Sequence, residues 1–297
     1  MGLGALNPLE TRTVCGPATS VIVVSHDSGD ELGRAVAAVL AQDSPIDVIV
    51  VDNASRDGSI ERLPDDPRLR VLRNPDNRGF AVACNQGANI ATGSHLLFLN
   101  PDCLLPPDAA TQLHRMVAAD AGVGVWGARL LNADGTRQAA ARRRTPTPGR
   151  ALRRALGIGR GGVEMSEATM GSSGAIEYVD AVSGALMLLP RGVFEQLGGF
   201  DEGYVLHCED LDLCRRVLQA GFRVAVANDL RVTHFKGTSS RRRPVWVEWQ
   251  KHRGMLRYFR KFDATSSPWW LRLAVPIGVW MRFTLAALRA WWRVRQS

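Results

Sequence analysis

The chain of 297 residues lacks several common signatures of metal and cofactor proteins. It has no CxxC pair, which excludes zinc knuckles and thioredoxin-type redox sites. No GxGxxG follows the first apolar run, and no GxxxxGK[ST] occurs anywhere, so the usual dinucleotide and P-loop phosphate sites are not predicted. The cysteines are few and odd in number, five in all, and we therefore expect free thiols in a reducing compartment.

The start of the chain also lacks the features of a targeting segment. It has neither a basic start nor a long apolar stretch, and Leu6 stands where N-myristoylation requires Ser or Thr. We therefore expect an N-terminal tail over residues 1–18 and a cytoplasmic protein.

Negative charge is nearly absent from two regions of a chain whose net charge is +8. Residues 131–160 hold eight Arg and one Asp, and residues 231–297 hold fifteen Lys or Arg and two acids. The remainder is net acidic, so we expect an anionic partner to meet the protein at specific places. Neither basic region carries interleaved aromatic platforms or a recognisable nucleic-acid motif, which argues against nucleic acid as that partner.

Apolar patterning predicts an α/β protein. Short β-branched runs alternate with helical periodicity over the first hundred residues, which is typical of βαβ units and a parallel sheet. The predicted strands are Ser20–Ser25, Ile46–Asp52, Arg68–Leu72, His95–Leu99, Val123–Leu131, Gly184–Leu189 and Phe222–Ala227. The predicted helices cover 30–42, 77–91, 190–197, 211–221, 245–262 and 269–295. Residues 140–175 have no clear period and are expected to form a long loop, mobile in part.

Acids at strand ends are the first chemical feature. Asp52 and Asp102 follow the second and fourth predicted strands, and ligands of open α/β sheets bind outside the carboxyl ends of the strands. Without a glycine-rich phosphate loop, a divalent cation held by carboxylate is the obvious way to bind phosphates. Asp52 is also a residue type that commonly begins a turn, and this turn role is its simpler interpretation.

Four motifs, in order, resemble family-2 inverting glycosyltransferases with the GT-A fold. They are VIVVSHDS, VIVVDNASRDGS, NPDNRGFAVACNQGANIATGSHLLFLNPD and SGALMLLPRGVFEQLGGFDEGYVLHCEDLDLCRRVLQAGFRV. The bacterial rhamnosyltransferase branch is the most similar, and the resemblance covers roughly residues 19–240. It implies a mostly parallel nucleotide-binding sheet flanked by helices, a nucleoside-diphosphate sugar donor, dTDP-L-rhamnose first, and a polyprenyl-diphosphate-linked or glycan acceptor. UDP-galactose and UDP-N-acetylglucosamine remain open as donors.

The resemblance also implies roles for individual residues. The metal, Mg²⁺ or Mn²⁺, is expected at Asp102 of the degenerate Asn100-Pro101-Asp102 triplet and at His234, although a lone His is more often structural. The expected nucleotide-binding residues are Ser25, His26, Asp52, Asn77, Gly79, Asn85 and Asn100.

The acceptor half carries the expected catalytic acids. By resemblance Asp210 is the general base, with Glu209 either orienting the acceptor or acting as the base itself. The alternative is that both acids only stabilise the start of a helix, by a favourable interaction with the helix dipole. Gly184 is expected to let a sugar approach the backbone, and is alternatively a strand bulge.

Two arginine runs remain open in function. Arg142–Arg144 and Arg241–Arg243 are either solvated or grip diphosphate through their guanidinium groups. Residues 237–240 lie between His234 and the second of these runs. They resemble the loop that closes over the donor in this fold.

The last segment, Trp269–Arg295, is apolar enough to suggest a transmembrane helix. Arg282 lies near its centre, at a cost of about 2.5–3.5 kcal/mol on insertion scales. Arg282, Arg289 and Arg293 share one helical face, which favours a helix lying in the interface of the inner face of the cell membrane. Packing on the domain or on a second subunit is the alternative, and the oligomeric state is not predicted.

We accordingly divide the chain into a tail (1–18), a glycosyltransferase domain (19–240) and a membrane-associating helical region (241–297). The domain comprises a nucleotide-sugar half (19–130), a basic loop region (131–176) and an acceptor half (177–240). Two other classes stay open: a sugar nucleotidyltransferase, although His26–Gly29 lacks the basic residue expected there, and a non-catalytic nucleotide-sugar binder, although Glu209 and Asp210 are intact.

Overall fold

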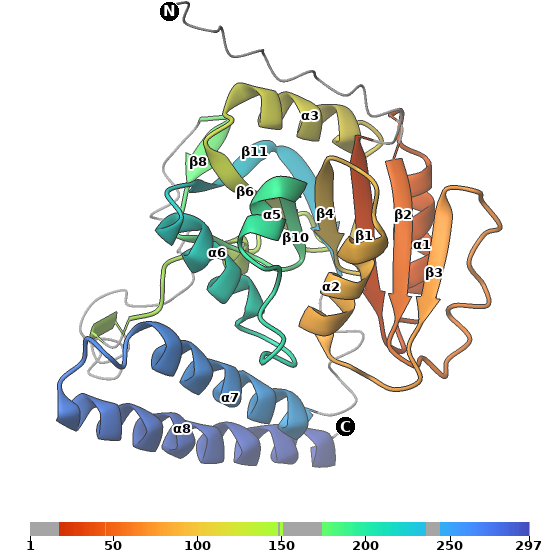
Figure 1. Ribbon diagram of the computed structural model, residues 1–297. Helices are drawn as coiled ribbons and strands as arrows, with labels where there is room; N and C mark the ends of the chain where they lie inside the picture. Colours follow the sequence, from red (N-terminus) through yellow and green to blue (C-terminus); the bar gives the residue numbers. More distant parts are fainter. Residues whose placement is uncertain (1–17, 45, 148, 151–173, 236–243, 297) are drawn as a thin grey trace, which may run out of the picture.

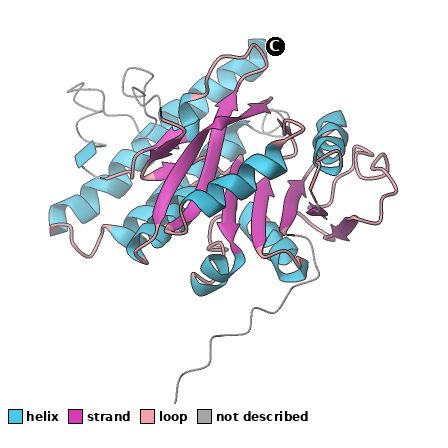
Figure 2. Cartoon of the chain, turned by 90° about the horizontal axis from the view of Figure 1, so that it is seen from above, coloured by secondary structure: helices cyan, strands magenta, loops and turns pink. Residues whose placement is uncertain are grey.

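The computed structural model describes residues 18–44, 46–147, 149–150, 174–235 and 244–296, with side chains up to 289. Its centre is one mixed sheet in the order β3-β2-β1-β4-β10-β6-β11-β5, with β8 paired to the first half of β11. Helices cover both faces of the sheet, so the body has three layers (Figures 1 and 2). The α/β architecture predicted from the sequence is confirmed.

The parallel half follows from the buried β-branched runs. β1 (Thr19–Ser25) lies between β2 (Ile46–Asp52) and β4 (His95–Leu99), and β3 (Leu69–Arg73) extends the sheet beyond β2. All four strands run parallel, with Ser25 opposite Asp52 and Val23 opposite Leu99. Their carboxyl ends therefore meet at one edge of the sheet, which we call the carboxyl edge.

The second half of the sheet brings distant segments to that same edge. β10 (Leu186–Pro190) runs antiparallel between β4 and β6 (Val123–Leu131), and β6 pairs in parallel with β11 (Arg223–His234). The short strands β5 (Cys103–Leu104) and β8 (Ile176–Tyr178) pair antiparallel with β11. β11 extends to His234, well beyond the predicted end at Ala227, because a register shift between Ala227 and Arg231 lets the strand continue past polar residues.

Two apolar clusters, one on each face of the sheet, form the core. α1 (Asp30–Leu40) and α3 (Ala109–Ala119) cover one face. α2 (Phe80–Ile90), α5 (Arg191–Gln196) and α6 (Glu209–Gln219) cover the other. The four cysteines that the structure describes are free thiols, as expected, and all four are buried.

The region predicted as a loop over 140–175 contains ordered structure at its start. A 3₁₀ turn at Ala139–Ala141 leads into β7 (Arg142–Arg143), which pairs with β9 (Ala181–Val182) in a small second sheet. Arg142 is 2% exposed and contacts Glu177 and Asn228, so this arginine is not solvated. The rest of that predicted loop is mostly outside the described residues, as are the predicted closing loop at 237–240 and Arg241–Arg243.

Two long helices, α7 (Pro244–Phe262) and α8 (Trp269–Gln296), pack along one another below the sheet (Figure 1). Trp249 of α7 faces α8, with its ring centroid 4.7 Å from that of Trp280 and 5.4 Å from that of Phe283. Ion pairs fix α7 to the body: Arg257 and Lys261 pair with Asp201, and Lys261 also pairs with the buried Asp212 of α6.

Candidate active site

The candidate metal ligands meet where β4 and β11 end. Asp102 follows β4, and His234 is the last residue of β11, opposite Cys103 in the strand pairing. The Asp102 Oδ1 and His234 Nε2 atoms are 3.2 Å apart, and both side chains are nearly buried. The sequence had placed both residues at this site, and the structure brings them together.

Gln138 fixes the orientation of the His234 ring. Its Nε2 donates to the carbonyls of Leu131 and His234, so its Oε1 is the atom that lies 3.0 Å from His234 Nδ1. His234 Nδ1 must therefore carry a proton and donate it to Gln138, which leaves the Nε2 lone pair facing Asp102 when the ring is neutral.

This arrangement suits a cation. Asp102 Oδ1 is buried and has no hydrogen-bond partner among the described residues, although it faces an imidazole nitrogen. Two facing lone pairs repel one another unless a positive charge lies between or beside them. Carboxylate oxygen with imidazole nitrogen is a donor set suited to Mn²⁺ and Mg²⁺, so the residues present fit a divalent ion.

Cys103 lies beside this pair but is an unsuitable ligand. Its sulfur, Asp102 and His234 offer ligand atoms within 4.8 Å of one another. However, burial raises the pKa of the Cys103 thiol well above its ordinary value, and the thiol donates to the Ala185 carbonyl. Since a metal takes a thiolate, Asp102 and His234 are the better ligands here.

Asp52, Ser25 and His26 lie at the carboxyl edge, next to one another. Asp52 is buried, and its Oδ1 accepts from the Ser55 N–H at 2.9 Å, which is the turn predicted as its simpler interpretation. Ser25 donates to the Ser28 hydroxyl, and His26 Nδ1 lies 2.8 Å from the Asn53 carbonyl. One Asp52 oxygen is thus used by the turn.

Three of the predicted nucleotide residues have other partners in the fold. Asn77 accepts from the Gly79 N–H, and a Cβ on Gly79 would lie 3.0 Å from the Val205 carbonyl, so the close approach that needs glycine is to the protein itself. Asn85 bonds to both the N–H and the carbonyl of Phe200, and also to Glu202. Asn85 therefore ties α2 to the segment that precedes Glu209 and Asp210.

Asn100 links the two halves of the site. Its N–H donates to the Ala185 carbonyl at 2.9 Å, which joins the end of β4 to the start of β10. Gly184, one residue earlier, donates from its N–H to Asp210 Oδ2 at 2.8 Å, and a Cβ there would lie 3.2 Å from that oxygen. The close approach at Gly184 is therefore to Asp210, and a bulge is not the reason for this glycine.

The two acids open α6 from a strained turn. His207 and Cys208 both have positive φ, 68° and 71°, a left-handed conformation that costs free energy in residues other than glycine. Gly254 of α7 supports this turn, because a Cβ there would lie 2.9 Å from the His207 carbonyl. The helix that packs against α8 thus also packs against the turn at His207 and Cys208.

The electrostatics of the acids differ. Burial, and then the neighbouring Asp210 charge, raise the pKa of Glu209 to about 8. Burial alone would also raise the pKa of Asp210, but the Arg143 charge and hydrogen bonds from Arg143, Gly184 and Leu211 outweigh it and lower that pKa. Arg143, from the run predicted to be solvated or to grip diphosphate, is instead the ion-pair partner of Asp210.

Sequence reasoning missed Gln138 and the contact of Arg143 with Asp210. The contact spans 67 positions of the chain, and Gln138 is 96 positions from His234. No local pattern marks either pair.

Known proteins are similar to this chain in sequence. N-acetylglucosaminyl-diphospho-decaprenol L-rhamnosyltransferase of Mycobacterium tuberculosis is 27% identical over 304 residues, covering 93% of each chain. The O-antigen biosynthesis protein RfbC of Myxococcus xanthus is 29% identical over 81% of this chain and 19% of its own.

Solved structures show the same GT-A fold at low identity. GalNAc-T7, solved with UDP, GalNAc and Mn²⁺, has a TM-score of 0.60 at 17% identity, over 83% of this chain and 48% of its own. The mannosyltransferase PcManGT of Pyrobaculum calidifontis, in complex with GDP-Man and Mn²⁺, has a TM-score of 0.56 at 19% identity. The match covers 93% of this chain and 73% of the mannosyltransferase. The sequence model of glycosyl transferase family 2 matches residues 20–177, more than half of the chain, which therefore belongs to this glycosyltransferase family.

Proposed function

We propose that the chain is a metal-dependent inverting glycosyltransferase that moves L-rhamnose from dTDP-rhamnose to a lipid-linked glycan acceptor in bacterial cell-wall or surface polysaccharide synthesis. The observation that carries the proposal is the carboxyl edge, where Asp102 and His234 face one another and Gly184 fixes Asp210 nearby. The relative from Mycobacterium tuberculosis supports the sugar and the lipid-linked acceptor by its name. UDP-galactose and UDP-N-acetylglucosamine are the alternative donors.

The chain's own residues divide the chemistry. Asp102 and His234 would hold Mg²⁺ or Mn²⁺, which when bound offsets the charge of the leaving nucleoside diphosphate. Asp210 accepts the proton of the acceptor hydroxyl while the hydroxyl oxygen attacks the anomeric carbon, and the bond to the diphosphate breaks. One displacement inverts that carbon. Asp52, Ser25 and His26 line the edge beside this centre and are proposed to contact the nucleotide, together with Asn100.

We also place the acceptor at a membrane. The helix over Trp269–Arg289 is long and apolar enough to cross a bilayer, with a mean hydropathy of 1.4, and most of its side chains are exposed or half-buried. Its outward stripe consists of Trp270, Leu273, Ile277, Met281, Leu285 and Leu288. Arg282 and Arg289 flank this stripe, as in a helix that lies in the headgroup region.

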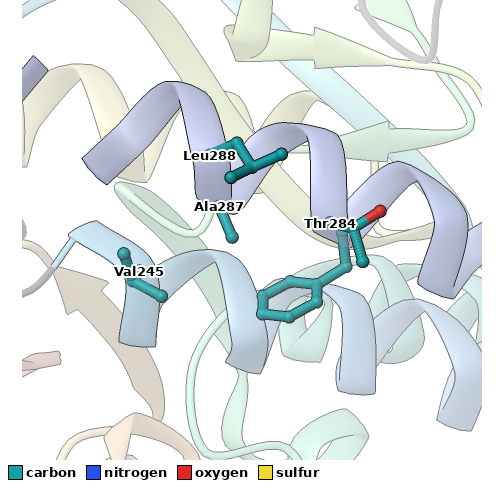
Figure 3. Close-up of a pocket in the computed structure, with 5 residues that line it drawn as sticks. Val245, Thr284, Ala287 and Leu288 are labelled. Atoms are coloured by element: carbon teal, nitrogen blue, oxygen red, sulfur yellow. The ribbon is translucent and has the colours of Figure 1, made fainter. Parts of the chain in front are cut away.

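An apolar groove adds to this surface. It has a volume of about 570 Å³ and lies between the start of α7 and the later turns of α8 (Figure 3). Its lining is Val245, Phe283, Thr284, Ala287 and Leu288. The groove and the stripe share Leu288, so they form one apolar surface on the helix pair, suited to lipid chains.

A panel of nucleotide sugars tests the enzymatic proposal. We expect turnover with dTDP-L-rhamnose and a polyprenyl-diphosphate-linked acceptor, stimulated by Mn²⁺ or Mg²⁺ and removed by a chelator. Turnover with UDP-galactose or UDP-N-acetylglucosamine, but not with dTDP-L-rhamnose, would change the assigned donor sugar and keep the assigned reaction. Binding of donors without any transfer would leave a non-catalytic binder and contradict the proposal.

A further inference from the structure

Glu209 and Asp210 form a buried pair of acids with unequal surroundings. The two residues are each 6% exposed. Asp210 is held by four donors: Leu211 N–H and Arg143 Nη1 on Oδ1, and Gly184 N–H and Arg143 Nη2 on Oδ2. Glu209 Oε2 is buried with no partner among the described residues.

The pair has one counter-charge. Within the described part of the chain, Arg143 is the cation that forms an ion pair with Asp210, and Glu209 forms none. A second buried negative charge without a partner would be costly, so one of the two acids keeps its proton.

The fold fixes which acid Arg143 meets. β7 pairs with β9, so that Arg143 lies opposite Ala181 and Arg142 opposite Val182. Arg142 is fixed by Glu177 and Asn228, and Arg143 also donates to the Val182 carbonyl. Neighbouring strand residues point to opposite sides, so anchoring Arg142 directs Arg143 toward α6.

We propose, on the basis of the function above, that Arg143 is a positioning residue that keeps the single negative charge of this pair on Asp210, with Glu209 as its protonated partner. Four donors occupy the four lone-pair directions of the Asp210 carboxylate. The longest of these contacts, Arg143 Nη1 to Oδ1 at 3.3 Å, is the one that the acceptor hydroxyl displaces. The remaining contacts hold the carboxylate while it takes the proton, and the proton of Glu209 does not move.

The first test is the pH dependence of kcat/KM for three variants. Arg143→Gln removes the cation that favours the charged form of Asp210. We therefore expect the acid limb of the kcat/KM profile to move to higher pH by one unit or more, with donor affinity unchanged. Arg143→Lys restores the charge and should keep the limb near its original position. Arg68→Gln removes an exposed pair with Asp66 and is the matched control, with no shift expected.

The second test needs no substrate. The raised pKa of Glu209 means that the folded state holds a proton that the unfolded state releases, so stability falls as pH rises from about 4.5 to about 8. Glu209→Gln imitates the protonated acid and should remove this slope, so its melting temperature should rise relative to the parent protein between pH 5 and pH 8. Glu195→Gln, on the exposed surface of α5, is the control that should follow the parent.

The outcomes separate the two proposals. A shifted acid limb in Arg143→Gln, together with a pH slope of stability that is lost in Glu209→Gln, supports the assignment. Loss of transfer in Glu209→Gln with an unchanged slope of stability would place the charge on Glu209 and overturn it. If the parent protein transfers no sugar at all, the proposed function fails, while the melting series still decides which acid is protonated.

Discussion

The carboxyl edge and the outer face of α8 differ in where their side chains find partners. At the edge, Asp210 has four donors and His234 is oriented by Gln138, all within the chain. On α8, Leu273 is 61% exposed and Met281 64%, although both are apolar. The edge is therefore preorganised by the protein itself, whereas the apolar stripe on α8 stays exposed, as in a surface proposed to bind an apolar partner.

If this contrast is correct, variants at the edge remove chemistry and leave membrane binding, and variants on α8 do the reverse. α7 connects the two regions, because Gly254 packs against the turn at His207 and Cys208 while Trp249 packs on α8. A variant that damages both properties would show that they are coupled.

The largest effect is expected for Asp102→Ala. It removes the one carboxylate at the proposed metal site, so metal-dependent donor binding should be lost while the melting temperature stays close to that of the parent. Calorimetric titration with dTDP or UDP, with and without Mn²⁺, measures this. Unchanged metal dependence would remove Asp102 from the site.

Asp210→Asn should lower transfer about 10²–10⁴-fold, the usual contribution of a general base. Donor binding should be nearly intact, because Asp210 acts on the acceptor. Single-turnover kinetics separate the two effects, and a near-normal rate would exclude Asp210 as the base.

Gln138→Leu should weaken metal binding about 10–100-fold, as is typical when the group that orients a ligating His is removed. The expected cause is loss of the Nδ1 hydrogen bond that presents Nε2 to the ion. Mn²⁺ titration monitored by electron paramagnetic resonance gives the affinity. Gln112→Leu, on α3, is a control of the same residue type, and equal affinities in both variants would argue against the role of Gln138.

The smallest effect is expected on α8. Ile277→Ala removes part of an apolar side chain worth about 1.5–3 kcal/mol when buried, so binding to anionic vesicles should fall about tenfold or less. Val71→Ala, which shortens an exposed side chain on β3, should leave binding unchanged. Co-sedimentation of both variants checks this, and equal partitioning would favour a packing or oligomer helix.

Much of the body could be predicted from sequence because its signals are local. Buried runs such as Ile46–Asp52 predict strands with the observed bounds, and acids placed directly after such runs must lie at the sheet edge. The outward stripe of α8 likewise follows from helical periodicity.

What could not be predicted depends on contacts between distant residues. A charge run is usually solvated, so nothing local indicates that Arg142 and Arg143 pair with acids in the interior. In α7 the apolar Trp246 and Trp249 stay about two-fifths exposed, while His252 and Gly254 are buried. Gly254 lies close to the His207 carbonyl, a contact that depends on backbone shape and that hydrophobicity does not encode.

The stereochemistry of transfer tests the central claim most directly. A single displacement, with Asp210 as base and no covalent intermediate, requires that the anomeric configuration of the transferred sugar be opposite to that of the donor. Proton NMR of the isolated product measures it. The account predicts the inverted anomer; a product with retained configuration would contradict it.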